Sequence, residues 1–249
     1  MSDMLTVTGL VLSAMPVGDY DKRLVLLTRE RGKITAFARG VRRQNSPLLA
    51  AASPFAFGQF SLFPGRDAYR LVQAEIQNYF RELSQDFEGA YYGFYFLEFA
   101  DYYTRENAEE SQMLKLLYAS LRALTRPSLP RVLVRYVYEL KAMVLNGEYP
   151  EVFHCTRCGR EEHLAAFVPE ENGLVCRECL PGTRSPVKLE ESAVYALQFI
   201  VSTPIEKLYT FTVSKPVLEQ IARIMERFRK KWVDHTFKSL EILESIPNY

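Results

Sequence analysis

Apolar and β-branched residues recur in short runs along the first eighty residues, and turn-forming residues separate these runs. Strands of about four to eight residues bounded by Gly, Pro, Asn or Ser produce this pattern. The five runs are 5–12, 23–28, 33–39, 57–63 and 69–74. Five strands in about 75 residues fit a small closed barrel better than a sandwich, which needs roughly seven strands and 100 residues. The pattern therefore predicts an N-terminal five-stranded oligonucleotide-binding (OB-fold) barrel.

From about residue 84 the apolar residues take a helical period, and the first helical segment is rich in aromatic residues. Its rings recur at positions 87, 91, 94, 95 and 99. A helix that is apolar nearly all round is usually buried on several sides. We therefore expect most of these rings in a core, with any exposed remainder free to dock a short apolar tail of another protein. Further helices are predicted over 110–124, 131–145, 190–202 and 216–244.

Residues 152–182 interrupt the helical pattern and contain all four cysteines of the chain. Cys155 and Cys158 form one Cys-x-x-Cys pair, Cys176 and Cys179 form a second, and seventeen residues separate the pairs. A two-residue spacer lets both thiolates of a tight turn reach one ion at about 2.3 Å, and two such turns complete a tetrahedral shell. The spacing predicts a structural zinc site in a small inserted module.

Other chemistry at these cysteines is less favoured. Four cysteine ligands leave no open coordination position, which a catalytic zinc ion needs. His154 and His163 are near enough in the sequence to replace one cysteine, and a disulfide-exchange pair is a further alternative. The zinc-deaminase signature, His-x-Glu ahead of Pro-Cys-x-x-Cys, does not occur in the sequence.

The third predicted strand has one small apolar face and one basic, aromatic face. Because side chains alternate along a strand, positions 34, 36 and 38 turn inward, and Lys33, Phe37 and Arg39 turn outward. Single-strand binders pair cations with an aromatic ring in this way to hold phosphates and to stack bases. The alternatives are an ordinary solvated face, or a register that turns Phe37 into the core. The other predicted nucleic-acid-binding residues, all near the adjoining loops, are Lys22, Arg23, Arg42, Arg43 and Arg66.

The charges are distributed unevenly. The chain has 31 basic and 30 acidic residues, but residues 1–80 hold ten basic and six acidic side chains. A second basic run, at 227–231, is either a phosphate contact or the solvated face of a helix. With no run of 18 apolar residues and no apolar signal core, we expect a cytoplasmic protein without a membrane span, whose cysteines are reduced or bind metal.

Sequence motifs of common catalytic sites do not occur in the chain. These include the phosphate loop, the dinucleotide-binding Gly-x-Gly-x-x-Gly, the nucleophile elbow Gly-x-Ser-x-Gly and His-Glu-x-x-His. The paired carboxylates are direct neighbours, which do not converge on one helical face. We therefore expect a protein that is not an enzyme.

A further set of short motifs lies at 18–23, 27–33, 38–43, 46, 54–55, 145–159, 166–170, 173–176 and 238–240. Together these motifs resemble the RecO family of bacterial recombination mediators. Each motif is loose, but all follow in one order between about residues 5 and 244. Asn45 departs from the pattern, because many members have a basic residue there, which weakens a phosphate contact at that position.

The resemblance implies an α+β protein with an OB-fold domain at 1–80 and a helical domain at 81–249, which contains the zinc module at about 152–182. It implies binding of single- and double-stranded DNA, annealing of complementary strands, and work with RecR, sometimes with RecF. Together these proteins would load RecA on DNA that is coated by single-stranded-DNA-binding protein. The resemblance places this function in the cytoplasm, at the nucleoid. By this resemblance, the eight predicted residues would bind DNA and the four cysteines would bind zinc. The helical body would bind the acidic tail of the single-stranded-DNA-binding protein.

Two other classes of protein stay open. The first is a zinc-stabilised adaptor that binds other proteins and has incidental DNA affinity, so that an oligonucleotide would leave its partner binding undisturbed. The second is a zinc-dependent enzyme, which an intact four-cysteine shell would exclude.

Overall fold

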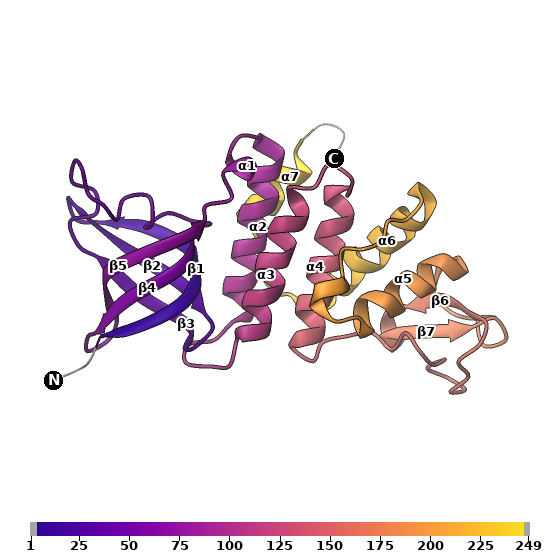
Figure 1. Ribbon diagram of the computed structural model, residues 1–249. Coiled ribbons are helices and arrows are strands. Elements are labelled where there is room, and N and C mark those ends of the chain that lie inside the picture. Colours follow the sequence, from indigo (N-terminus) through magenta and orange to yellow (C-terminus); the bar gives the residue numbers. More distant parts are fainter. Residues whose placement is uncertain (1–3, 247–249) are drawn as a thin grey trace. The chain divides into compact units, whose positions relative to one another are not determined.

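Five strands close a barrel in the computed structural model, which describes residues 4–246 (Figure 1). The order around the barrel is β1-β2-β3-β5-β4, with β1 also paired to β4. The β3–β5 pair is parallel and the others are antiparallel. This confirms the predicted closed five-stranded barrel. The strands are β1 (Leu5–Val17), β2 (Asp21–Thr28), β3 (Gly32–Ala38), β4 (Phe57–Pro64) and β5 (Tyr69–Asn78).

The first strand is longer than its apolar run predicts, and barrel closure is the reason. Its first half pairs with β4 and its second half pairs with β2. A register shift between Val11 and Ser13 lets the strand bend between these two neighbours. One long bent strand therefore pairs with both β2 and β4 and closes the barrel.

The barrel core follows the predicted alternation of β3. Ile34, Ala36 and Ala38 are buried among side chains such as Val11 and Phe60. Gly32, at the β2–β3 turn, has φ of 62°, and a Cβ atom there would lie 2.3 Å from the carbonyl oxygen of Ala108. Only glycine permits both this backbone conformation and this close approach.

Four helices accompany the barrel: α1 (Arg81–Ser84), α2 (Phe87–Tyr103), α3 (Ser111–Leu124) and α7 (Lys238–Glu244). The core expected for the aromatic helix α2 forms in part. Tyr95 and Phe99 are fully buried, whereas Phe87 is 62% and Phe94 38% exposed. Of the two exposed rings, Phe94 lies 4.9 Å from the buried Phe55 ring and Phe87 lies 4.7 Å from the Tyr91 ring.

The predicted continuous helix over 216–244 is wrong, because the chain forms two helices with a break at 233–237. α6 spans Lys215–Trp232, and α7 begins at Lys238. The intervening residues Val-Asp-His-Thr-Phe include β-branched and Asp residues, which are weak helix formers. Phe237 is buried against α2, with ring centroids 5.3 Å from Tyr95 and 5.4 Å from Phe99.

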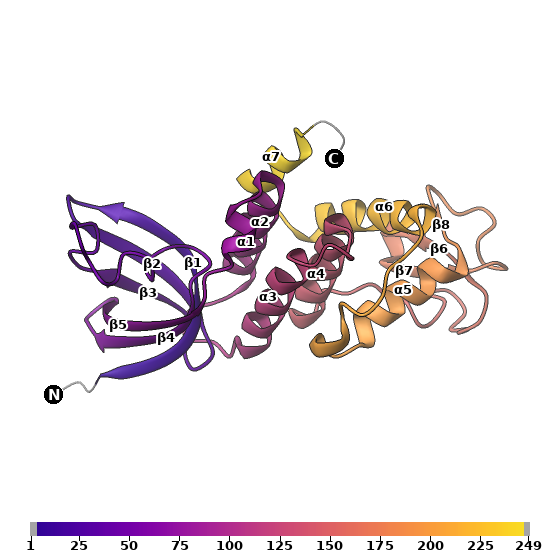
Figure 2. The ribbon, with the colours of Figure 1, turned by 45° about the horizontal axis from the view of Figure 1, so that its top comes forward.

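The cysteine module lies between helices α4 (Arg131–Leu145) and α5 (Glu191–Ser202). Its three-stranded sheet has the order β7-β6-β8 and packs against α5 and α6, where the Phe167 and Phe228 rings lie 6.5 Å apart (Figure 2). Short 3-10 turns cover Pro169–Glu171 (η1) and Ile205–Lys207 (η2). The strands are β6 (Leu164–Val168), β7 (Gly173–Cys176) and β8 (Val187–Lys188).

Contacts along the chain divide it into two units. The first joins the barrel, α1 to α3 and α7, and the second runs from Arg126 to Thr236. α7 belongs with the first unit because it packs on α2. The predicted boundary at residue 80 separates an OB-fold domain from a helical domain, each expected to fold by itself. That boundary stays a prediction. Within residues 4–246, every helix is too short or too polar to cross a bilayer.

Candidate metal centre and nucleic-acid interface

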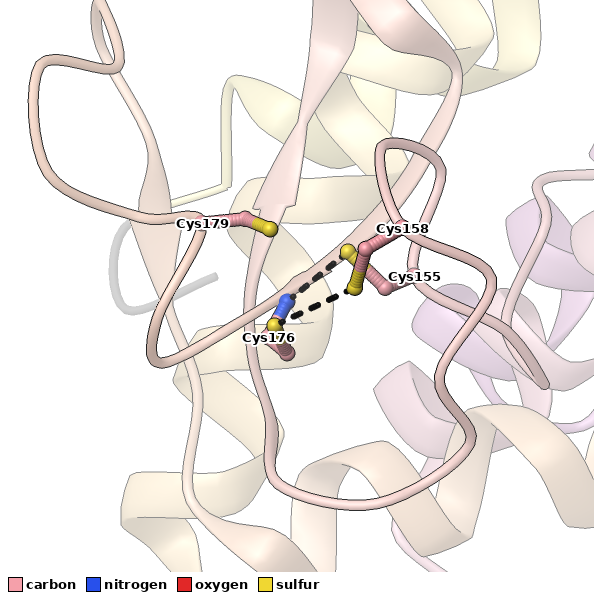
Figure 3. A group of neighbouring side chains, drawn as sticks. All are labelled: Cys155, Cys158, Cys176 and Cys179. Atoms are coloured by element: carbon pink, nitrogen blue, oxygen red, sulfur yellow. Dashed lines mark hydrogen bonds between the residues drawn. The ribbon is translucent and has the colours of Figure 1, made fainter.

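The four cysteines converge from two turns of the inserted module (Figure 3). Their sulfur atoms all lie within 4.8 Å of one another, and the Cys158 and Cys176 sulfurs are 3.8 Å apart. In a tetrahedral zinc site with Zn–S bonds of about 2.3 Å, neighbouring sulfurs are also about 3.8 Å apart. The predicted four-cysteine cluster is therefore present, and its dimensions fit a zinc ion.

Local hydrogen bonds shape the cysteine turns. Gly159 has φ of 74°, and its N–H donates to the Cys155 carbonyl over 2.9 Å, which closes the first turn. The Cys176 N–H points at the Cys155 sulfur over 3.4 Å. A backbone N–H group that points at a sulfur stabilises the thiolate form. This arrangement therefore favours a negatively charged Cys155 sulfur, the form that binds a metal cation.

The thiols of the cluster differ in pKa. Burial opposes ionisation of Cys155, but three backbone N–H groups aimed at its sulfur outweigh this and lower its pKa to about 6. Hydrogen bonds with Cys158 and Cys176 raise the pKa of the Cys179 thiol to about 12. A divalent cation among the four sulfurs would hold all of them as thiolates.

Charged side chains brace the cluster from outside. The Arg157 guanidinium donates from Nη2 to Oε1 of Glu171 over 2.6 Å and from Nη1 to the Cys179 carbonyl over 2.5 Å. It thereby links the first cysteine turn to the second. Thr156 also donates to Glu171 over 2.5 Å, and Arg160 pairs with Glu178. These contacts orient the turns that present the sulfurs.

Neither nearby histidine joins the cluster in the described part of the chain. The His154 ring lies 3.4 Å from both Glu151 and Glu161. His163 has φ of 56° and lines a groove on the module. The group of side chains that could hold a metal ion consists of the four cysteines, as the spacing predicts.

Phe37 lies on the outer face of β3 between two arginines. The register pairs Phe37 with Arg23 of β2 and with Arg70 of β5, and paired residues share a face of the sheet. Beyond Arg23 the row continues to Met15 of β1, and beyond Arg70 to Phe63 of β4. We call these five residues, Met15, Arg23, Phe37, Arg70 and Phe63, the cross-strand row.

The cross-strand row alternates apolar and cationic side chains on an open surface. Met15 is 61% exposed, Phe63 is 36% exposed, and Phe37 is half-buried. The Arg70 guanidinium carbon lies 5.5 Å from the centre of the Phe63 ring, within cation–π range. In such a row, the apolar side chains can stack on bases and the arginines between them can bind phosphates.

Sequence reasoning missed Met15, Phe63 and Arg70 as members of this surface. Alternation along 69–74 already indicates that Arg70 turns outward, because its neighbour Leu71 belongs to the core. The parallel pairing of β3 with β5, which sets Arg70 beside Phe37, has no local signal in the sequence.

A second group of predicted cations gathers at the β1–β2 loop. Arg42 donates to the Gly18 carbonyl over 3.1 Å, and the Arg43 guanidinium lies 5.2 Å from the centre of the Tyr20 ring. Lys22 points to the opposite face from Arg23 and donates to the Ala52 carbonyl over 2.8 Å. Burial, followed by the charge of Arg42, lowers the pKa of Lys22.

The remaining predicted cations are Arg39, Arg66 and Lys33. Arg39 is exposed directly after β3, and Arg66 is exposed in the β4–β5 loop. Lys33 is paired with Asp101 at the end of α2, with 3.0 Å between its ammonium nitrogen and the carboxylate. Lys33 also lines one small pocket with Arg23 and Met15 and a second with Arg66. The contacts of the eight residues with DNA stay predictions.

The basic run on α6 contacts the cysteine module. Arg227 donates to the Ser185 carbonyl over 2.8 Å, and Lys231 donates to the Pro169 carbonyl over 3.1 Å. Lys230 pairs with Glu226 one turn earlier on the helix. In this structure the run helps to hold the module against α6.

Comparison with known proteins finds similarity along nearly the whole chain. Residues 1–80 match the family described as "Recombination protein O N terminal", and residues 84–241 match "Recombination protein O C terminal". Three relatives named "DNA repair protein RecO" illustrate this. The relative from Acetivibrio thermocellus is 26% identical over 97% of both chains. That from Alkaliphilus metalliredigens is 28% identical over 98% of this chain and 100% of its own, and that from Symbiobacterium thermophilum 29% over 98% of both.

Proposed function

The chain belongs to the RecO family of DNA repair proteins, and from this premise we propose that it binds single- and double-stranded DNA and anneals complementary strands. The observation that carries the proposal is the cross-strand row on an OB-fold barrel. Open aromatic and guanidinium groups on such a barrel are the chemistry with which proteins bind single strands.

Annealing requires that two like-charged strands approach each other. Arginines on the row, with Arg42 and Arg43 at the β1–β2 loop, would screen this repulsion, and Phe37 would hold unpaired bases by stacking. No covalent step is needed, which agrees with the expectation of a protein that is not an enzyme.

The proposed partners are RecR, in some settings RecF, and through them RecA. The protein would help to load RecA on single strands coated by single-stranded-DNA-binding protein, and the helical body would receive the acidic tail of that coating protein. Family membership supports this part of the proposal.

The proposed cofactor is one structural zinc ion held by Cys155, Cys158, Cys176 and Cys179. Its chemistry would be a cross-link between two turns, since four thiolates fill the tetrahedral shell. The small module has few buried apolar residues, so a metal cross-link would contribute much of its stability.

The test is annealing of two complementary oligonucleotides, one coated with single-stranded-DNA-binding protein, followed over a salt series with and without RecR. We expect acceleration that fades with salt. Roughly four to six phosphate contacts give a slope of log affinity against log salt of about −3 to −4 on single strands. No acceleration by folded, zinc-loaded protein would contradict the proposal and favour the adaptor interpretation.

A further inference from the structure

A groove of about 1160 Å³ lies in the second unit, on the side of α5 that faces the cysteine module. One wall is formed by the residues around the start of β6, and the other by residues 210–214, between η2 and α6. Figure 1 and Figure 2 both show α5 lying alongside the module's sheet. The groove belongs neither to the metal cluster nor to the barrel.

The wall at 210–214 is a segment outside the helices and strands of the described residues. Its sequence Thr-Phe-Thr-Val-Ser is rich in strand-forming residues, and its burial alternates, with Phe211 and Val213 half-buried and the others exposed. Within residues 4–246, the N–H and C=O groups of 211–213 make no backbone hydrogen bond. A row of unpaired backbone groups is a template to which another strand can add.

The floor of the groove is aromatic. The Phe199 ring lies 4.9 Å from the Phe211 ring and 6.4 Å from the Tyr195 ring. Tyr195 is 66% exposed, so a large part of this surface is open to solvent. A bound apolar side chain would cover it and gain from leaving water.

The charged side chains along the groove favour a ligand of opposite charge. Three carboxylates line it among the described residues, from Glu161, Glu162 and Glu191, against the single guanidinium of Arg177. All three carboxylate residues are exposed. The groove therefore complements a segment with positive charge.

We propose that this groove binds a segment of a partner protein that adds as a strand along residues 211–213. The segment alternates basic and apolar residues, with an apolar side chain on Tyr195 and Phe199 and a basic side chain against Glu161 and Glu162. This interaction is separate from the proposed DNA function and does not depend on it.

The test uses the full chain and a fluorescent eight-residue peptide that alternates Lys with Val or Leu, blocked at both ends. We expect saturable binding in fluorescence anisotropy, no binding of the same peptide with Glu in place of Lys, and loss of binding when alternate backbone nitrogens are methylated. Methylation removes the N–H donors that strand addition needs and leaves charge and side chains unchanged.

Two pairs of variants locate the peptide on the protein. Tyr195→Ala is expected to weaken binding about tenfold, whereas Tyr149→Ala, at another exposed tyrosine of the same unit, leaves it unchanged. Glu162→Gln is expected to weaken binding about threefold, with Glu170→Gln, outside the groove, as its control. All four positions are at the surface, so these variants fold.

Three results would overturn the proposal. The first is equal binding of the methylated and unmethylated peptides, which excludes strand addition. The second is equal loss with the groove variants and their controls, which indicates non-specific attraction of cations. The third is self-association in sedimentation equilibrium that Tyr195→Ala abolishes, because the groove would then be covered by a second copy of the chain.

Discussion

The ammonium nitrogen of Lys33 lies 3.0 Å from the Asp101 carboxylate and donates over 2.6 Å to the Asp101 carbonyl oxygen. The two residues join β3 of the barrel to the end of α2. Alternation alone places Lys33 on the same outer face as Phe37, yet the helix covers one end of that face and leaves the other end open. A cation predicted for DNA is therefore engaged within the protein.

This pairing predicts that Lys33→Met lowers the free energy of unfolding by about 1 kcal/mol, because the carboxylate and the carbonyl oxygen of Asp101 both lose their donor. Urea unfolding measures this loss. The slope of log affinity against log salt for single-stranded DNA is expected to stay unchanged. A slope reduced by about 0.7 at unchanged stability would show instead that Lys33 holds a phosphate.

The cross-strand row predicts two separable losses of DNA affinity. Phe37→Ala removes a stacking surface, which is worth about 1–3 kcal/mol per base, and leaves the salt slope unchanged. Arg70→Gln removes one phosphate contact and reduces the slope by about 0.7. Titrations of a labelled oligonucleotide over a salt series distinguish the two. Arg29→Gln is the control, since Arg29 pairs with Glu30 at the β2–β3 turn; an equal effect there would remove the row from the DNA surface.

Metal removal is expected to loosen the module and to spare the barrel. A chelator, or Cys155→Ala, takes away the cross-link between the two turns, and the module's own core is small. Hydrogen exchange should then speed up over residues 152–182 while β1 to β5 keep their protection. Metal analysis should give one zinc ion per chain before treatment. Loss of protection in the barrel would refute this modular behaviour.

Glu171 is expected to tune metal affinity from outside the ligand shell. It accepts hydrogen bonds from Thr156 and Arg157, both in the first cysteine turn, so Glu171→Ala frees that turn. We expect zinc affinity to fall about 10- to 100-fold in a competition with a chromogenic chelator. Glu170→Ala, one residue earlier and exposed, is the control and should leave affinity unchanged. Equal affinities of the two variants would assign Glu171 no part in metal binding.

The C-terminal helix is expected to stabilise the first unit through Phe237. Phe237→Ala removes a buried ring that packs on Tyr95 and Phe99, at a cost of about 3–5 kcal/mol. Chemical unfolding followed by the signal of α2 and α3 measures this. Ile242→Ala, at a side chain 36% exposed on α7, should cost far less. Similar costs for the two variants would mean that α7 does not dock through Phe237.

Much of this protein can be predicted from short stretches of its sequence. The five strand positions, the helix at Arg131–Leu145 and the inward side of β3 follow from local periods of two and 3.6 residues. The convergence of the four cysteines also begins locally, because each Cys-x-x-Cys turn brings its own two thiols together.

The tertiary structure decided which of these local features meet. Arg70 lies beside Phe37 because β3 and β5 pair in parallel, and residues 33 apart in sequence carry no signal of that pairing. Lys33 is paired because the end of α2 lies over one end of β3, and α7 docks on α2 because Phe237, just before it, is buried there. Local backbone geometry determines strands, helices and turns, but the partners of a side chain depend on long-range packing. The sequence by itself therefore identified the elements and the cysteine cluster, and only the folded chain selected the open part of the barrel surface.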